Sequence, residues 1–87
     1  MILYFQNSNN EEIEIGRGQT LKEINKISNQ YLKDHNFKSY YTRVTFENKN
    51  RVSLDFGSHI EFFIITNEDD TNVDIIELYK EQQKQFN

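Results

Sequence analysis

The chain contains no cysteine, and its 87 residues leave room for a single modest core. The absence of thiols excludes disulfides, thiolate nucleophiles and zinc sites built on cysteine, so a domain of this size must be stabilised by packing. Long apolar runs are also absent, and no basic region precedes an apolar stretch at the N-terminus. We therefore expect a cytoplasmic protein with no membrane segment.

A surplus of positive charge is absent as well, since the formal net charge is -4. Proteins that bind nucleic acid directly neutralise phosphates with Lys and Arg, so direct nucleic-acid binding is not expected. The charge is uneven: residues 16–51 carry +5 and residues 52–87 carry -6. The acidic part includes a cluster that is either a solvated face or a surface complementary to a basic channel in a partner: Glu68, Asp69, Asp70, Asp74, Glu77 and Glu81.

The first half of the chain predicts two strands and a helix. Residues 2–5 are apolar and aromatic, and residues 12–15 alternate strictly between Glu and Ile, which is typical of a strand pair. Thr20 followed by Glu23 forms a capping box, after which apolar residues recur at helical spacing. We expect this helix to end near Asn36, a residue type that tolerates a left-handed turn.

From Phe37 the apolar residues recur at every second position, as in strands. An odd number of residues in each connecting loop keeps the apolar residues of neighbouring strands on one face, and this requirement predicts the register. A loop at residues 48–50 pairs Glu47 with Arg51 and sets Arg43 opposite Asp55, with Tyr40, Val44, Phe46, Val52, Leu54 and Phe56 on the core face. A second loop at residues 57–59 sets Asp55 opposite Glu61 and Leu54 opposite Phe62. In this register Phe63 and Ile65 point away from the helix.

Thr71 with Asp74 predicts a second cap, and Ile75, Ile76, Tyr79 and Phe86 follow at nearly helical spacing. We therefore predict one α+β domain over residues 1–87, with an antiparallel sheet in the order β-β-α-β-β-β-α and the first helix packed on one sheet face. Residues 1–66 form the sheet and that helix, and residues 67–87 form an acidic loop and a C-terminal helix. The register leaves open whether this helix covers Phe63 and Ile65 or contacts a second chain.

The predicted register gathers five polar residues as a ligand-binding or partner-binding site: Tyr41, Arg43, Asp55, His59 and Glu61. An arginine among carboxylates beside a histidine suits an anionic ligand or acid–base chemistry. The plainer interpretation is a cross-strand ion pair that stabilises the sheet by about 0.2 to 1 kcal/mol. We expect no metal site, because the two histidines lack clustered partners, and no cofactor, because residues 16–20 lack the length and lysine of a P-loop.

Two motifs carry a resemblance to a known group. The segments Asn-Phe-Lys-Ser-Tyr-Tyr-Thr-Arg at residues 36–43 and Asp-Phe-Gly-Ser-His-Ile-Glu-Phe-Phe at residues 55–63 resemble small proteins encoded by phages and prophages of Gram-positive bacteria. They cover about a fifth of the chain, whose residues 67–87 extend beyond where many members of the group stop. The resemblance implies a phage accessory protein in a bacterial host cell, without implying an activity.

Three hypotheses follow. The first is a non-enzymatic inhibitor of a host protein, for instance an anti-CRISPR-like protein that blocks a nucleic-acid-binding effector through the acidic cluster or the Arg43 face. The second is a protein that binds a nucleotide-like ligand at Arg43, Tyr41 and His59. The third is a virion or replication accessory protein, with a homodimer through Phe63 and Ile65.

Overall fold

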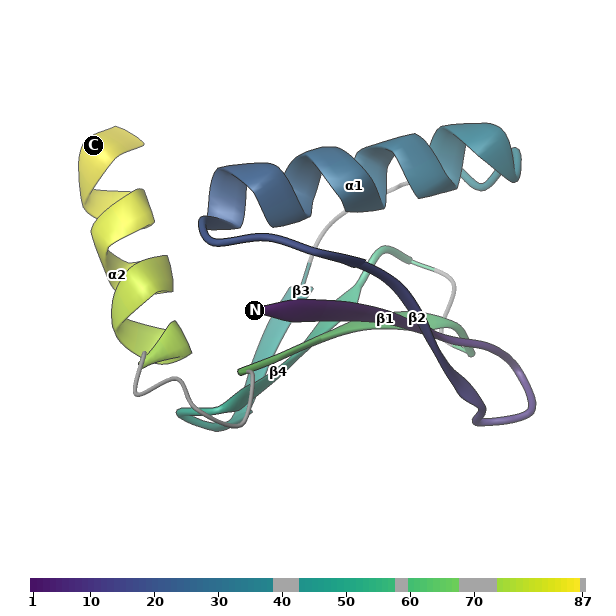
Figure 1. Cartoon of the computed structure of the whole chain (residues 1–87), viewed down its shortest axis with the longest axis horizontal. Helices are drawn as coiled ribbons and strands as arrows, with labels where there is room; N and C mark the ends of the chain where they lie inside the picture. The colour runs from purple at the N-terminus through teal and green to yellow at the C-terminus, as the bar shows by residue number, and fades with distance from the viewer. Residues whose placement is uncertain (39–42, 58–59, 68–73, 87) are drawn as a thin grey trace.

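The computed structural model describes residues 1–38, 43–57, 60–67 and 74–86, and of residues 82–86 it describes the backbone alone. Within these ranges the chain forms an antiparallel five-stranded sheet and two helices in the order β-β-α-β-β-β-α, which confirms the predicted fold class (Figure 1). The elements are β1 (Ile2–Gln6), β2 (Glu12–Arg17), α1 (Leu21–Asp34), β3 (Arg43–Asn48), β4 (Arg51–Asp55), β5 (Phe62–Thr66) and α2 (Ile75–Phe86). The strand order across the sheet is β2-β1-β5-β4-β3, so β2 and β3 are the edges.

Both helices lie on the same side of the sheet (Figure 1). The core fills the space between the helices and the strands, and it consists of Met1, Leu3, Phe5, Leu21, Ile24, Leu32, Val52, Leu54, Phe56, Phe63, Ile65, Ile75 and Tyr79. Neither helix of the described residues is long and apolar enough to cross a membrane. The opposite side of the sheet carries neither of the two helices.

Helix α1 begins and ends where the sequence predicts. Thr20 is its N-cap and accepts a hydrogen bond from the Glu23 N–H at 3.2 Å, while the Glu23 carboxylate accepts from the Gln19 N–H at 2.9 Å. Two amides at the helix start are thereby satisfied, as in a capping box, although the second one belongs to Gln19 and not to Thr20. At the other end Asn36 adopts a positive φ of 57°, which confirms the left-handed turn.

In the hairpin between β3 and β4, the residues face the predicted sides of the sheet, but the turn differs from the predicted one. Arg43 stands opposite Asp55 and Val44 opposite Leu54, as predicted. The prediction that Glu47 pairs with Arg51 across a three-residue loop is wrong, because Asn48 pairs with Arg51 and the ladder shifts between Phe46 and Asn48. Glu47 is the extra residue of this bulge, so one inserted residue and a shorter turn preserve the same facing.

The predicted register between β4 and β5 is wrong by one residue. Leu54 pairs with Phe63 and Asp55 with Phe62, instead of Leu54 with Phe62 and Asp55 with Glu61. A slip of one position exchanges the two faces of a strand. Phe63 and Ile65 therefore lie in the core, at 2% and 0% exposure, whereas Phe62 is half-buried on the helix-free side.

Helix α2 also differs from the prediction. Its N-cap is Asp74, whose Oδ1 accepts from the Glu77 N–H at 3.2 Å, and Thr71 lies outside the described residues. The helix packs on the core side through Ile75 and Tyr79, with Tyr79 edge-on to Phe46 at 5.8 Å between ring centroids. Phe46, predicted as core, is 42% exposed beside this contact, and Tyr40 lies outside the described residues.

Candidate functional site

The helix-free side of the sheet is the first candidate surface, and we call it the open face. The strand register assigns it Ile2, Tyr4 and Gln6 of β1, Glu12, Glu14 and Arg17 of β2, Phe62, Ile64 and Thr66 of β5, Arg51, Ser53 and Asp55 of β4, and Arg43 and Thr45 of β3. Its middle row is Tyr4, Ile64, Ser53 and Thr45, which stand opposite one another in turn. Tyr4 and Ile64 thus lie at the centre, Ser53 and Thr45 continue the row toward β3, and charged residues lie around them.

Arg51 organises one end of the open face. Its Nε donates to Glu47 Oε2 at 2.6 Å, and its second guanidinium nitrogen donates to Glu12 Oε1. The other Glu47 oxygen accepts from the Ser53 hydroxyl at 3.0 Å. Partial burial lowers the pKa of Arg51, but the hydrogen bonds and negative charges of Glu12 and Glu47 outweigh this effect and raise it.

The contact between Arg51 and Glu12 shows that the open face is concave. Arg51 belongs to β4 and Glu12 to β2, which are separated by β5 and β1. Arg51 lies in the row of Thr66 and Ile2, four positions along the strands from the row of Glu12, so in a flat sheet the two residues would be about 14 Å apart across the strands and about 13 Å apart along them. The two side chains therefore meet across the central strands. Figure 1 shows the matching backbone shape, since the β1–β2 and β3–β4 hairpins both bend away from α1. This curvature explains why Ile64 is 1% exposed on a face without a helix.

Of the five residues predicted as a site, the structure brings two together. Arg43 and Asp55 stand directly opposite on the open face. Asp55 Oδ1 also accepts a hydrogen bond from the Gly57 N–H at 2.8 Å, so this carboxylate stabilises the turn after β4 as well as facing an arginine. The backbone register therefore sets Arg43 opposite Asp55, as the plainer interpretation requires.

Glu61 does not join this pair. It precedes β5 on the side of the core, and its charge, after burial, contributes to raising the pKa of Tyr31 on α1. The expected grouping of Glu61 with Asp55 is therefore wrong, because the register of β5 is shifted by one residue. Tyr41 and His59 lie outside the described residues.

The predicted acidic surface is described only in its second half. Asp74 caps α2, Glu77 lies 3.6 Å from Lys80 as an ion pair, and Glu81 is exposed. Glu68, Asp69 and Asp70 lie outside the described residues. The part of the cluster that the structure describes thus combines one helix cap with an ordinary exposed helix surface.

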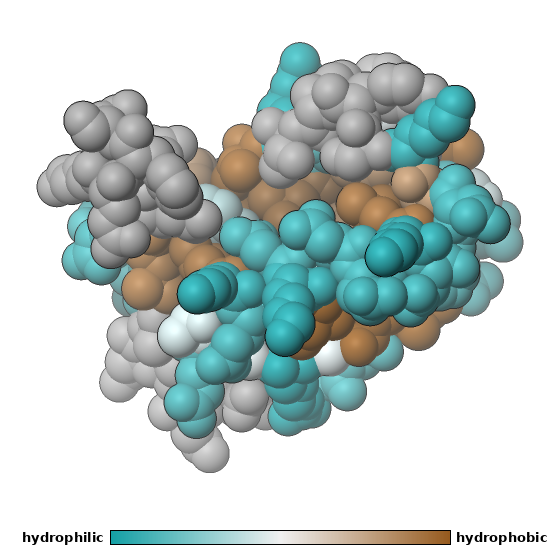
Figure 2. Space-filling view, turned by 90° about the horizontal axis from the view of Figure 1, so that it is seen from above, coloured by the Kyte–Doolittle hydropathy of each residue, from teal (hydrophilic) through white to brown (hydrophobic). Residues whose placement is uncertain are grey.

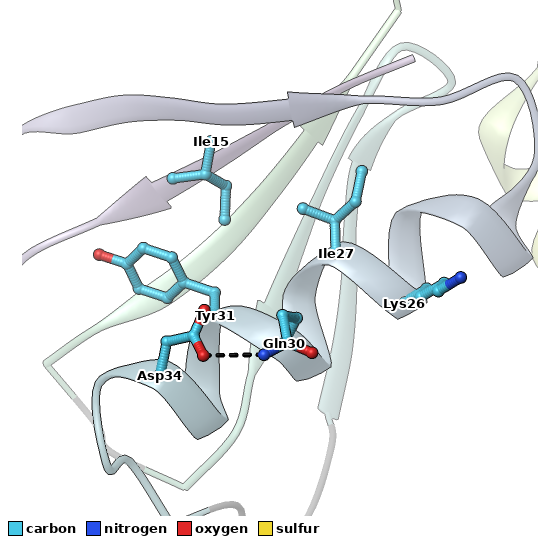
Figure 3. Close-up of a pocket in the computed structure, with 6 residues that line it drawn as sticks. All are labelled: Ile15, Lys26, Ile27, Gln30, Tyr31 and Asp34. Carbon is cyan, nitrogen blue, oxygen red and sulfur yellow. Dashed lines mark hydrogen bonds between the residues drawn. The ribbon is translucent and has the colours of Figure 1, made fainter.

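A second candidate site is an open hollow of about 360 Å³ between α1 and β2. It is lined by Ile15, Lys26, Ile27, Gln30, Tyr31 and Asp34. Figure 3 shows Ile27 and Tyr31 of α1 directed toward Ile15 of β2, with Gln30 donating a 2.8 Å hydrogen bond to Asp34. The floor is therefore apolar and the rim is polar, a pattern typical of binding pockets.

Gly16 allows β2 to approach α1 closely beside this hollow. A Cβ at Gly16 would lie 2.9 Å from the Cγ2 and Cδ1 atoms of Ile27. Just along the strand, Ile13 is 47% exposed on the same side of the sheet. Figure 2, which looks onto the helix side, shows apolar surface along both flanks of the hydrophilic side chains that α1 presents.

The Arg51 network and the hollow were not predicted from the sequence. Parity indicates which residues share a face within neighbouring strands, but it does not give the order of strands across a sheet. The Glu-Ile alternation of residues 12–15 indicates that Glu12 and Glu14 share one face of the sheet and Ile13 and Ile15 the other. Which residues of other strands they can reach depends on the position of β2 at the edge of the sheet. No group of three or more His, Asp or Glu that could hold a metal ion occurs in the part of the chain described.

Comparisons with protein-family models, with curated proteins and with solved structures give no match for this chain. The resemblance to phage proteins therefore stays a prediction from two short motifs.

Proposed function

We propose that this chain is a non-enzymatic accessory protein that binds a host protein and inhibits it, with a bacterial defence effector as the expected target. The observation that carries the proposal is the open face. Its half-buried aromatic residues, Tyr4 and Phe62, are flanked by arginines and carboxylates. Protein interfaces commonly combine an aromatic centre, arginine and a polar rim.

The charge of the open face favours a protein over a nucleic acid as the partner. Its arginines, Arg17, Arg43 and Arg51, are matched by Asp55, Glu12 and Glu14 on the same face. A nucleic-acid surface instead requires a local surplus of positive charge. The phage origin, the inhibitory effect and the cytoplasmic location belong to the same proposal and rest on the motif resemblance.

A capture experiment with a matched pair of variants tests the proposal. Thr45 lies exposed in the middle row of the open face, and Asn29 lies exposed on α1. Thr45→Glu and Asn29→Glu therefore add the same charge on opposite sides of the molecule. Tagged wild-type protein incubated in a lysate of a Gram-positive host should retain one stoichiometric protein partner.

We expect Thr45→Glu to reduce the retained amount at least about tenfold, because a buried unpaired charge at an interface is costly, and Asn29→Glu to leave it unchanged. Equal retention by both variants, or no stoichiometric partner for the wild type, would contradict the proposal. If a partner is found, its activity with and without the chain tests the inhibition.

The hypothesis of a nucleotide-like ligand remains a separate prediction. A thermal-shift measurement against a nucleotide panel tests it, since a ligand at a hundred times its Kd stabilises a protein by about 2.7 kcal/mol.

A further inference from the structure

We propose that β2 receives an extended segment of the partner protein as an added strand, and that basic and apolar side chains alternate in this segment. The proposal rests on the proposed function and names the part of the partner that is recognised. It is suggested first by size. From strand spacings, the open face has a footprint of about 300 Å², whereas each partner in a stable complex buries about 800 Å². A stable complex therefore needs contacts beyond the open face.

The outer edge of β2 is where such contacts can form. β2 is the outermost strand on its side of the sheet that the structure describes. Backbone N–H and C=O groups along a sheet edge can pair with an incoming strand. Because Glu12 and Glu14 also belong to the open face, this edge is continuous with the surface already proposed.

The β1–β2 hairpin determines which backbone groups of β2 face outward. The Asn7 N–H donates to the Glu11 carbonyl at 3.0 Å. Opposite residues of an antiparallel pair alternate between hydrogen-bonded and non-hydrogen-bonded positions. Counting from that pair, Ile13 is bonded to β1, whereas the backbone groups of Glu12 and Glu14 point to the free edge.

The side chains of β2 define the chemistry of the incoming strand. A residue opposite Ile13 would lie on the core side, next to the hollow formed by Ile15, Ile27 and Tyr31, where an apolar side chain fits. Residues opposite Glu12 and Glu14 would lie on the open face, within reach of two carboxylates. Each carboxylate already pairs with an arginine of this chain, Glu12 with Arg51 and Glu14 with Arg17, but both keep exposed surface that a second cation can reach. Opposite charges stabilise such cross-strand pairs, so Lys or Arg is expected there.

The same charges argue against a second copy of this chain. Two β2 strands paired antiparallel about Ile13 would place Glu12 of one opposite Glu14 of the other, and pairing about Glu14 would place it opposite itself. Like charges directly opposite one another are destabilising. The homodimer surface expected from the sequence is also not accessible, because Phe63 and Ile65 are buried.

A peptide experiment on the full chain tests this inference without the natural partner. The probe is a fluorescent peptide of about eight residues in which Lys and Val alternate, long enough to cover β2, and the control peptide alternates Glu and Val. By fluorescence anisotropy we expect the basic peptide to bind about tenfold more tightly. Equal binding of the two peptides, or no binding of either, would overturn the inference.

A charge-reversed variant sharpens the test. Glu12→Lys with Glu14→Lys should prefer the acidic peptide. The matched control, Glu77→Lys with Glu81→Lys on α2, changes the net charge equally and should keep the preference for the basic peptide. Loss of preference in the α2 control alone would place binding on the acidic helix and contradict the inference.

Amide hydrogen exchange on the wild type decides the matter if the reversed variant does not fold. Without peptide, the amides of Glu12 and Glu14 should exchange fast and that of Ile13 slowly. With the Lys-Val peptide, those of Glu12 and Glu14 should become slow, and unchanged rates would refute strand addition. If Thr45→Glu abolishes partner capture while every peptide result is negative, the proposed function stands and this inference alone fails.

Discussion

Two adjacent phenylalanines at the start of β5 have opposite environments. Phe63 is 2% exposed and packs among the rings of Phe5 and Phe56, with centroids at 5.8 and 5.4 Å. Phe62 is half-buried on the open face. The energetic consequences of truncating them should differ accordingly.

We expect Phe63→Ala to lower the free energy of unfolding by about 3 to 5 kcal/mol, because it removes a buried ring and leaves a cavity. Phe62→Ala should lower it by about 1 kcal/mol, since only part of its surface is buried. Urea denaturation of both variants measures the difference. The reverse order would support the register predicted from parity and contradict the register described here.

Tyr79 is the second informative residue. Its side chain is buried, and its hydroxyl makes no hydrogen bond within the part of the chain that the structure describes. Burial raises the pKa of Tyr79 to about 12 from the ordinary 10.0. A neutral hydroxyl without a partner costs stability at neutral pH, and an ionised one would cost more.

Tyr79→Phe should therefore raise the free energy of unfolding by about 1 kcal/mol at pH 7. The wild type should lose about 1 kcal/mol per pH unit between pH 10 and pH 12, because Tyr79 ionises there mainly in the unfolded chain. In Tyr79→Phe this contribution is absent, and in Tyr4→Phe it persists. Denaturation curves at pH 9, 10 and 11 measure it, and identical pH slopes in all three proteins would contradict the assignment.

At the scale of elements, α1 offers the clearest local test. Thr20→Ala removes the acceptor for the Glu23 N–H and should destabilise the protein by about 1 kcal/mol. Gln19→Ala is the control, because Gln19 contributes its backbone N–H and not its side chain to the cap. It should change stability by less than about 0.5 kcal/mol. Equal effects of the two substitutions in thermal melts would show that the cap contributes nothing.

Several elements were predictable because they carry a local signal. A capping box and helical spacing define α1, and alternation defines β2, β3 and β4. Asn36 is a residue type that favours a left-handed turn, and it adopts a positive φ. The alternation of apolar residues also predicted which residues of β3 and β4 share a side of the sheet. This prediction is correct although the predicted loop was too long, because the bulge at Glu47 restores the alternation.

The register of β5 could not be predicted, and the reason is physical. Phe62, Phe63, Ile64 and Ile65 are all apolar, so alternation does not distinguish the two faces of this strand. β5 is central, and its Ile64 is as buried as Ile65. A strand covered on both sides carries no periodic signal, and one residue more in the preceding loop changes every facing. The misplacement of Glu61 follows from this single ambiguity.

At the scale of the whole molecule, the proposed function depends on an asymmetry that the sequence does not display. Both helices and the core lie on one side of the sheet, while Arg51 and Glu12 meet across the other. Residues from β1, β2, β3, β4 and β5 thus form one concave surface with an accessible edge at β2. Strand order, which no local pattern encodes, creates both features.

Hydrogen–deuterium exchange on the complex with the captured host protein locates the binding surface. If the open face and the β2 edge bind the partner, exchange slows in residues 2–6, 12–17 and 62–66 and is unchanged in the exposed residues of α1. Protection confined to α1 or α2, with the sheet unchanged, would contradict binding at this surface.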